Sequence, residues 1–131
     1  MVDSYAWVEI FLGSDRGAKS RRMIEEAEEA LTPDTVLAEV ARKYLREGLD
    51  ETDIGSRLRS IHAATTVTSI DIEVGIQSAR AFLELADKAL RERLQRPSLF
   101  DAIVLATTRA YQAKLITGDE HLLGLPEVIS I

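Results

Sequence analysis

Apolar residues recur at helical spacing along most of this 131-residue chain, and short aliphatic or β-branched runs separate the helical segments. Apolar positions three and four residues apart predict an amphipathic helix, whereas a short apolar run bounded by turn residues predicts a strand. We therefore predict helices over residues 5–12, 15–29, 34–48, 52–64 and 71–89, with residues 90–95 as a helical extension or a loop. We predict strands over residues 30–33, 65–70, 114–117 and 128–131. Short strands alternating with helices are typical of an α/β fold, in which helices cover both faces of a mostly parallel sheet.

A sixth predicted helix and the strand after it carry an acid at each end. Pro97 and Ser98 form a helix-start signal, and small alanines on the apolar face would let this helix pack closely on a sheet. Asp101 lies in its first turn, and Asp119 follows the strand over residues 114–117. Because ligand sites in parallel sheets form beyond the carboxyl ends of the strands, the two carboxylates are expected at one edge.

Composition narrows the class of protein. With 46% hydrophobic residues, the chain can form one globular domain over residues 1–131. It has no apolar run near the ~20 residues of a membrane span and no secretory signal, so we expect a soluble, cytoplasmic protein. It has no cysteine, which excludes disulfides, thiolate zinc sites and cysteine nucleophiles.

The net charge of −6 argues against tight, unspecific binding to nucleic acid. Local basic clusters nevertheless leave a binding patch open. The stronger candidates for phosphate contact precede Asp101, namely Arg91, Arg93 and Arg96. Arg42 and Lys43, with Arg46, are weaker candidates because such a cluster is more often a solvated helix face.

Four acids are expected at or beside strand ends: Asp3, Glu39, Asp101 and Asp119. Oxygen ligands without cysteine suit hard cations, meaning Mg²⁺ or Mn²⁺. Clustered carboxylates cannot all stay ionised without such a cation, because like charges raise one another's pKa. A pair of these ions can activate water and stabilise a leaving oxygen in phosphodiester cleavage.

The motifs around these acids resemble those of PIN-domain ribonucleases, and most closely the VapC-type toxins of prokaryotic toxin–antitoxin pairs. The resemblance covers essentially the whole chain, through four motifs in order: Asp3-Ser4, Leu37-Ala-Glu39-Val40, Leu99-Phe-Asp101-Ala-Ile-Val-Leu-Ala-Thr107 and Leu115-Ile-Thr117-Gly-Asp119. It implies a three-layer α/β/α fold and a Mg²⁺- or Mn²⁺-dependent endoribonuclease.

The same resemblance implies roles for residues and partners. Asp3, Glu39, Asp101 and Asp119 would be the metal-binding and catalytic quartet. Thr117 would be an accessory catalytic hydroxyl, and Ser4 could do similar work. The resemblance also implies a homodimer, an RNA substrate, and an antitoxin whose tail occupies the groove and silences the site.

Each acid also has a simpler structural interpretation. Asp3 and Asp101 could be helix caps, and Glu39 could pair with Lys43 one turn away. Asp119 could cap the turn at His121, which we interpret mainly as a turn residue. Only Met1 and Val2 precede Asp3, whereas family members usually have an apolar strand there. Either the central strand is short or the recorded start lies downstream of the natural one.

Two other classes of function compete with that of a nuclease. A catalytically silent PIN-fold module that binds RNA or a protein would have no need to keep costly like charges. Phosphoryl transfer to an aspartate requires paired acids after the first strand, or an Asp-x-Asp motif. Asp3-Ser4-Tyr5 has neither, so this class is set aside.

Overall fold

The computed structural model describes all residues from 1 to 131 and contains six helices and four strands in an α/β order. The helices are α1 (Ser4–Leu12), α2 (Asp15–Glu26), α3 (Asp34–Arg46), α4 (Glu51–Ala64), α5 (Ile72–Glu92) and α6 (Leu99–Ala110). The strands are β1 (Leu31–Pro33), β2 (Thr66–Thr68), β3 (Leu115–Thr117) and β4 (Val128–Ser130). The predicted order of elements is confirmed.

Two parallel strand pairs are joined through the first residues of the chain. β1 pairs with β2 and β3 pairs with β4, both in parallel. Val2 forms a parallel bridge with Ile116, and its N–H donates to the carbonyl of Leu31 at 2.8 Å. The N–H of Ile116 in turn donates to the carbonyl of Met1 at 2.9 Å. Residues 1–3 therefore act as a very short central strand between β1 and β3, with Met1 and Val2 buried.

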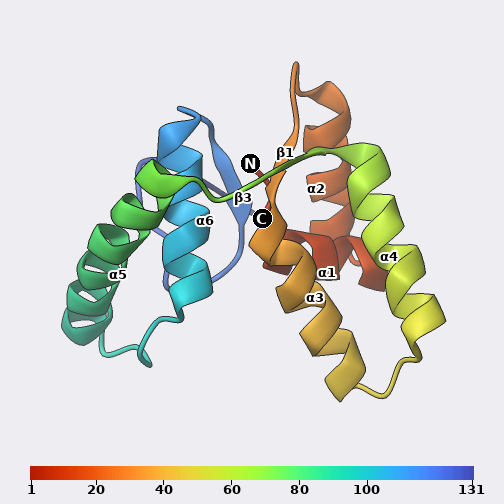
Figure 1. Ribbon diagram of the computed structural model, residues 1–131, viewed down its shortest axis with the longest axis horizontal. Coiled ribbons are helices and arrows are strands. Elements are labelled where there is room, and N and C mark those ends of the chain that lie inside the picture. The colour runs from red at the N-terminus through yellow and green to blue at the C-terminus, as the bar shows by residue number, and fades with distance from the viewer.

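Helices cover both sides of these strands, as the α/β/α prediction required. Figure 1 shows α5 and α6 on one side and α1, α2, α3 and α4 on the other. α6 packs closely because small residues, Ala102 and Ala106, face the core and are 0% and 1% exposed. None of the helices has the length and apolar character that a membrane crossing demands.

Some helices begin or end at other residues than predicted, and at the two ends of α5 the capping residues show why. α5 begins after Asp71, whose side chain accepts the N–H of Val74, and the helix extends through Glu92. Arg93 then adopts a left-handed conformation (φ 59°) that ends the helix, so residues 90–95 are part helix and part loop. α2 ends at Glu26, three residues earlier than predicted. α3 begins at Asp34, directly after Pro33, and has no side-chain cap.

Two helices each leave an alanine exposed. Ala79 is exposed because the inner face of α5 follows Val74, Ser78, Ala81 and Leu85. Ala18 is likewise exposed, because Gly17 and Ser20 form the inner face of α2. A Cβ on Gly17 would lie 2.1 Å from the carbonyl oxygen of Glu9, so a glycine lets α2 approach α1 there.

Candidate metal centre

The four predicted acids come from four separate segments and meet at one edge of the strands. Asp3 follows the short central strand, Asp119 follows β3 after one residue, Glu39 lies in α3, and Asp101 lies in the first turn of α6. The charges of Glu39 and Asp119 act on Asp3, and those of Asp101 and Asp119 act on Glu39. The side chains do not form a closed cage, since no three Asp, Glu or His groups stand close enough to hold a cation as they are.

Asp3 is the most buried of the acids, with 5% of its surface exposed. Its Oδ1 accepts the backbone N–H of Ser4 at 2.6 Å, so the predicted cap on α1 is present. Its Oδ2 accepts the hydroxyl of Thr117 at 2.6 Å. Burial raises the pKa of Asp3 to about 7, against the lowering effect of the Thr117 hydrogen bond, and Glu39 and Asp119 add to the rise. Asp3 therefore caps α1 and also belongs to the cluster of acids.

The Thr117 hydroxyl joins two of the acids. It donates to Asp3 and accepts the N–H of Asp119 at 3.0 Å, and the side chain is fully buried. Gly118 between them leaves room for Tyr5, because a Cβ there would lie 2.5 Å from the Tyr5 ring. The tight turn after β3 packs against α1 and places Asp119 at the edge of the strands where the other acids lie.

Asp101 is held by a capping box at the start of α6. Its Oδ2 accepts both the N–H and the hydroxyl of Ser98, at 2.7 and 2.9 Å, while the Ser98 hydroxyl accepts the N–H of Asp101. Burial raises the pKa of Asp101, and the charge of Asp119 contributes. The cap uses only one of the two carboxylate oxygens, which leaves the other available to a ligand.

Glu39 is half-buried, and burial raises its pKa. The Ser4 hydroxyl and the charge of Arg42 oppose this rise, whereas Asp101 and Asp119 reinforce it. The suggested pairing of Glu39 with Lys43 is wrong, because Lys43 Nζ contacts Glu47 Oε1 at 2.6 Å instead. Glu39 therefore belongs to the acidic cluster.

A cleft of about 430 Å³ opens beside the acids, between α1 and α3. Its acidic lining residues are Glu9, Glu39 and Asp119, and Arg42, Lys43 and Arg46 line it from α3. Tyr5, Val8 and Leu12 supply apolar surface from α1. The cleft therefore combines acidic, basic and apolar lining.

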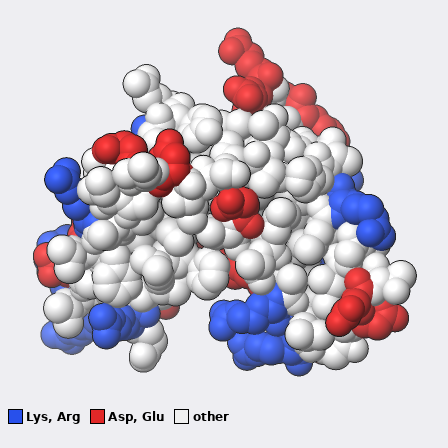
Figure 2. Space-filling model, viewed as in Figure 1, with Lys and Arg blue, Asp and Glu red and all other residues white.

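The second basic cluster lies elsewhere. Arg91, Arg93 and Arg96 are exposed around the end of α5 and do not line this cleft, and the Arg96 guanidinium lies over the Phe82 ring at 5.4 Å. Figure 2 shows basic side chains in separate groups on this face of the molecule. The cleft thus favours Arg42 and Lys43, the weaker candidates from sequence, for phosphate contact.

His121 is part of the site, although we interpreted it mainly as a turn residue. Its N–H donates to Asp119 Oδ1 at 2.8 Å, which is the turn cap that the sequence suggested. Its ring also contacts Asp119 Oδ1 through Nδ1 at 3.0 Å and the carbonyl of Gln95 through Nε2 at 2.9 Å. Burial lowers the pKa of His121, but the contacts with Gln95 and Asp119 outweigh it and raise the pKa overall. Its position two residues after Asp119 was the available signal, but the Gln95 contact is not visible in sequence.

Comparison with known proteins shows what this chain is similar to. The PIN domain family matches residues 1–127. A toxin–antitoxin complex from Klebsiella pneumoniae contains a similar chain, with a TM-score of 0.67 and 20% identity, covering 98% of this chain and 93% of that one. VapBC2 from Rickettsia felis, bound to a DNA fragment from its promoter, gives a TM-score of 0.70 and 16% identity, covering 100% and 96%. No curated protein matches the sequence. At these identities the solved structures show a shared fold, and the match over residues 1–127 shows that the chain belongs to the PIN domain family, whose members are generally nucleases.

Proposed function

We propose that this protein is a Mg²⁺- or Mn²⁺-dependent endoribonuclease and the toxin of a VapBC-type toxin–antitoxin pair. The observation that carries the proposal is the meeting of Asp3, Glu39, Asp101 and Asp119 at one edge of a PIN-family fold. Burial, and to a lesser degree the neighbouring carboxylates, raise the pKa of Asp3, Glu39 and Asp101, so keeping these groups ionised is costly without a compensating cation.

The donor set fits a hard divalent cation. All four groups are carboxylates, and the Ser4 and Thr117 hydroxyls lie among them. Oxygen donors of this kind suit Mg²⁺ or Mn²⁺. When bound, the ion would lower the pKa of water and offset negative charge on the scissile phosphate.

The other residues would orient the acids and the RNA. Thr117 holds the Asp3 carboxylate and the Asp119 backbone in a fixed relation. Arg42 and Lys43, at the edge of the cleft, would contact phosphates on either side of the scissile bond. Hydrolysis adds the oxygen of water to phosphorus and breaks the bond to the 3′ oxygen. That oxygen takes a proton, leaving a 5′-phosphate and a 3′-hydroxyl.

Removal of metal tests the reaction directly. Protein treated with EDTA is expected to stop cleaving a labelled single-stranded RNA, and excess MgCl₂ or MnCl₂ should restore cleavage. Gel analysis of the products would show both the cleavage and the end groups. Undiminished cleavage in EDTA would contradict metal dependence. Calorimetry separates the alternative function, because absence of Mn²⁺ binding at millimolar concentration would indicate a silent RNA- or protein-binding module.

We also propose that an antitoxin segment occupies the cleft between α1 and α3. One similar solved structure is a toxin–antitoxin complex, and another is VapBC2 from Rickettsia felis. The cleft offers an apolar wall for a helix or extended segment, including Leu12, which is 65% exposed. A segment seated there would cover Glu39 and Asp119 and exclude RNA.

A homodimer is the third part of the proposal, and the outer face of α5 supports it. Six apolar residues recur there at alternating spacings of four and three: Ile72, Ile76, Ala79, Leu83, Ala86 and Leu90. Ile72, Leu83 and Leu90 are 85%, 67% and 79% exposed. This spacing is typical of a helix that packs along a second helix. In an antiparallel pairing of two copies, Leu83 would face Ala79 and Ile76 would face Ala86, so large and small side chains would alternate across the two-fold axis.

A charged residue in this stripe of apolar residues on α5 is expected to dissociate the dimer. Leu83→Glu would place a carboxylate at the centre of the contact and convert the dimer to a monomer, as measured by light scattering after size exclusion. Leu45→Glu, at an exposed leucine of α3 outside the stripe, is the matched control and should stay dimeric. A monomeric wild-type protein, or a dimer unaffected by Leu83→Glu, would refute the α5 interface.

A further inference from the structure

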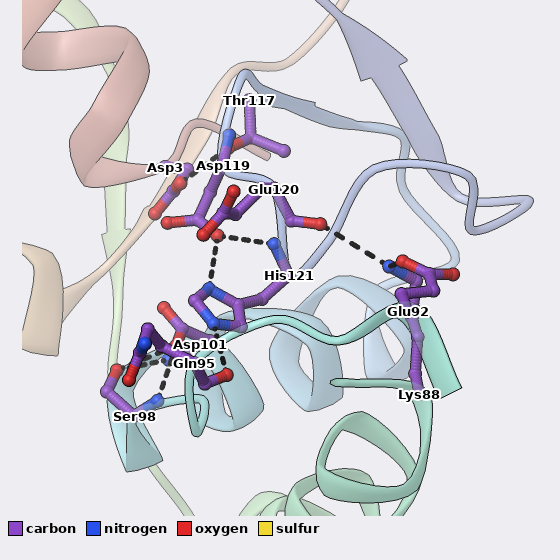
Figure 3. A network of polar contacts seen from close by, with 10 residues as sticks. All are labelled: Asp3, Lys88, Glu92, Gln95, Ser98, Asp101, Thr117, Asp119, Glu120 and His121. Atoms are coloured by element: carbon purple, nitrogen blue, oxygen red, sulfur yellow. Dashed lines mark hydrogen bonds and ion pairs between the residues drawn. The ribbon is translucent and has the colours of Figure 1, made fainter. Parts of the chain in front are cut away.

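His121 connects two segments that each carry an acid of the proposed metal site. Its ring Nδ1 lies 3.0 Å from Asp119 Oδ1, and its Nε2 lies 2.9 Å from the carbonyl oxygen of Gln95. Figure 3 shows the ring between Asp119 on one side and the loop of Gln95 and Ser98 on the other. The ring is mostly buried, with 14% of the side chain exposed.

The Gln95 loop leads directly into the capping box of Asp101. Gln95 stands three residues before Ser98, whose N–H and hydroxyl hold Asp101 Oδ2. Both partners of the His121 ring are acceptors that carry no hydrogen, so each ring nitrogen donates when both contacts form. The ring therefore ties the turn after β3 to the loop that starts α6.

A second contact holds the same turn from α5. Lys88 is buried, with 6% of its surface exposed, and its Nζ donates to the carbonyl of Glu120 at 3.3 Å. The same Nζ is paired with Glu92 Oε2 at 2.7 Å. The three-residue turn from Asp119 to His121 is thus fixed at both of the residues that follow the acid (Figure 3).

Electrostatics explains why such a link is needed. Burial raises the pKa of Asp101 and the charge of Asp119 adds to the rise, so the two carboxylates repel each other when both are ionised. The Asp119 carboxylate sits on a short turn, which could rotate away from Asp101. A side chain that bonds both segments opposes that movement.

We propose that His121 is a positioning residue for the metal-binding carboxylates, which fixes the Asp119 carboxylate through Nδ1 and holds it beside Asp101 through the Gln95 carbonyl. This inference rests on the proposed metal-dependent nuclease function. Side chains that orient metal ligands typically change metal affinity by about 10- to 100-fold when they are removed.

Three substitutions separate the two contacts. His121→Ala removes both, and should weaken Mn²⁺ binding by about 10- to 100-fold in calorimetry and lower kcat for RNA cleavage more than it changes KM. In His121→Asn, the amide nitrogen can occupy the place of Nδ1 and donate to Asp119, so most of the Mn²⁺ affinity should return. In His121→Gln, the amide nitrogen can reach the place of Nε2 but not that of Nδ1, so less affinity should return. His62→Ala, at the exposed histidine of α4, is the control and should bind Mn²⁺ as the wild type does.

The outcomes distinguish this inference from the function on which it rests. Unchanged Mn²⁺ affinity in His121→Ala, or equal weakening in His121→Ala and His121→Asn, overturns the positioning role while wild-type cleavage leaves the nuclease proposal standing. Wild-type protein that neither binds Mn²⁺ nor cleaves RNA overturns the nuclease proposal itself. A variant that melts at a lower temperature but keeps its Mn²⁺ affinity shows a purely structural role for His121, which also overturns the inference.

Discussion

Replacement of Asp101 by asparagine is expected to lower RNA cleavage by at least ~100-fold while the protein stays folded. The amide oxygen of asparagine can still accept the N–H and hydroxyl of Ser98, which bond Asp101 Oδ2 at 2.7 and 2.9 Å, so α6 keeps its cap. What is lost is one negative charge and one strong oxygen ligand for the cation. Gel-based cleavage rates and circular dichroism would measure the two effects separately.

A matched control uses another capping aspartate. Asp50 caps α4 by accepting the N–H of Asp53 at 2.8 Å, and it is exposed. Asp50→Asn should therefore leave the cleavage rate unchanged. If Asp101→Asn cleaves RNA at the wild-type rate, the acidic cluster is not the catalytic centre.

The stability of the metal-free protein is expected to fall as pH rises from about 4 to about 7. Asp3 has a pKa of about 7 in the folded chain, against 3.8 when unperturbed, chiefly because it is buried. Between these values the folded state binds more protons than the unfolded state, so the free energy of unfolding decreases with pH. Below pH 4 the Asp3 carboxyl is protonated in both the folded and the unfolded state, so it does not change the free energy of unfolding. Above pH 7 it lowers the free energy of unfolding by its full amount, roughly 4 kcal/mol. Glu39 and Asp101 contribute with the same sign.

Urea unfolding in EDTA at pH 5, 6, 7 and 8 would measure this dependence. Asp3→Asn should remove most of the slope, because an amide does not titrate. Asp71→Asn is the control, because Asp71 also caps a helix, by accepting the N–H of Val74 at 2.8 Å, but is exposed. Mn²⁺ should stabilise the wild type more at pH 8 than at pH 5, since only ionised carboxylates bind it well. Equal wild-type stability at pH 5 and pH 8 without metal would show that burial does not hold the Asp3 carboxyl protonated.

Local signals in the sequence were sufficient for the elements and for the identity of the acids. The Pro97-Ser98 start signal predicted the beginning of α6, and Ser98 does cap it. The helix predicted from residue 71 is α5, which Asp71 caps, and the alternation of strands and helices predicted the parallel α/β fold. These features depend on residues within a few positions of one another, which is why a linear pattern records them.

Features that depend on distant residues were missed or misjudged. Thr117 and Asp3, which share a hydrogen bond, are 114 positions apart, and His121 and Gln95 are 26 apart. The sequence suggested Lys43 as a partner for Glu39, but Lys43 pairs with Glu47, and Glu39 is next to the acids of distant segments. Arg91, Arg93 and Arg96 precede Asp101 closely in sequence, yet Arg42 and Lys43 are the ones that line the cleft.

The sequence by itself determined which carboxylates are present and where they lie relative to the predicted helices. It also determined that no cysteine thiolate competes with them for a metal ion. Only the tertiary structure decided that residues 1–3 insert between β1 and β3, that Asp3 is buried, and that His121 links Asp119 to the loop before Asp101. The reason is physical: capping and periodicity are short-range properties of the backbone, whereas burial and electrostatic coupling arise from packing of segments far apart in the chain.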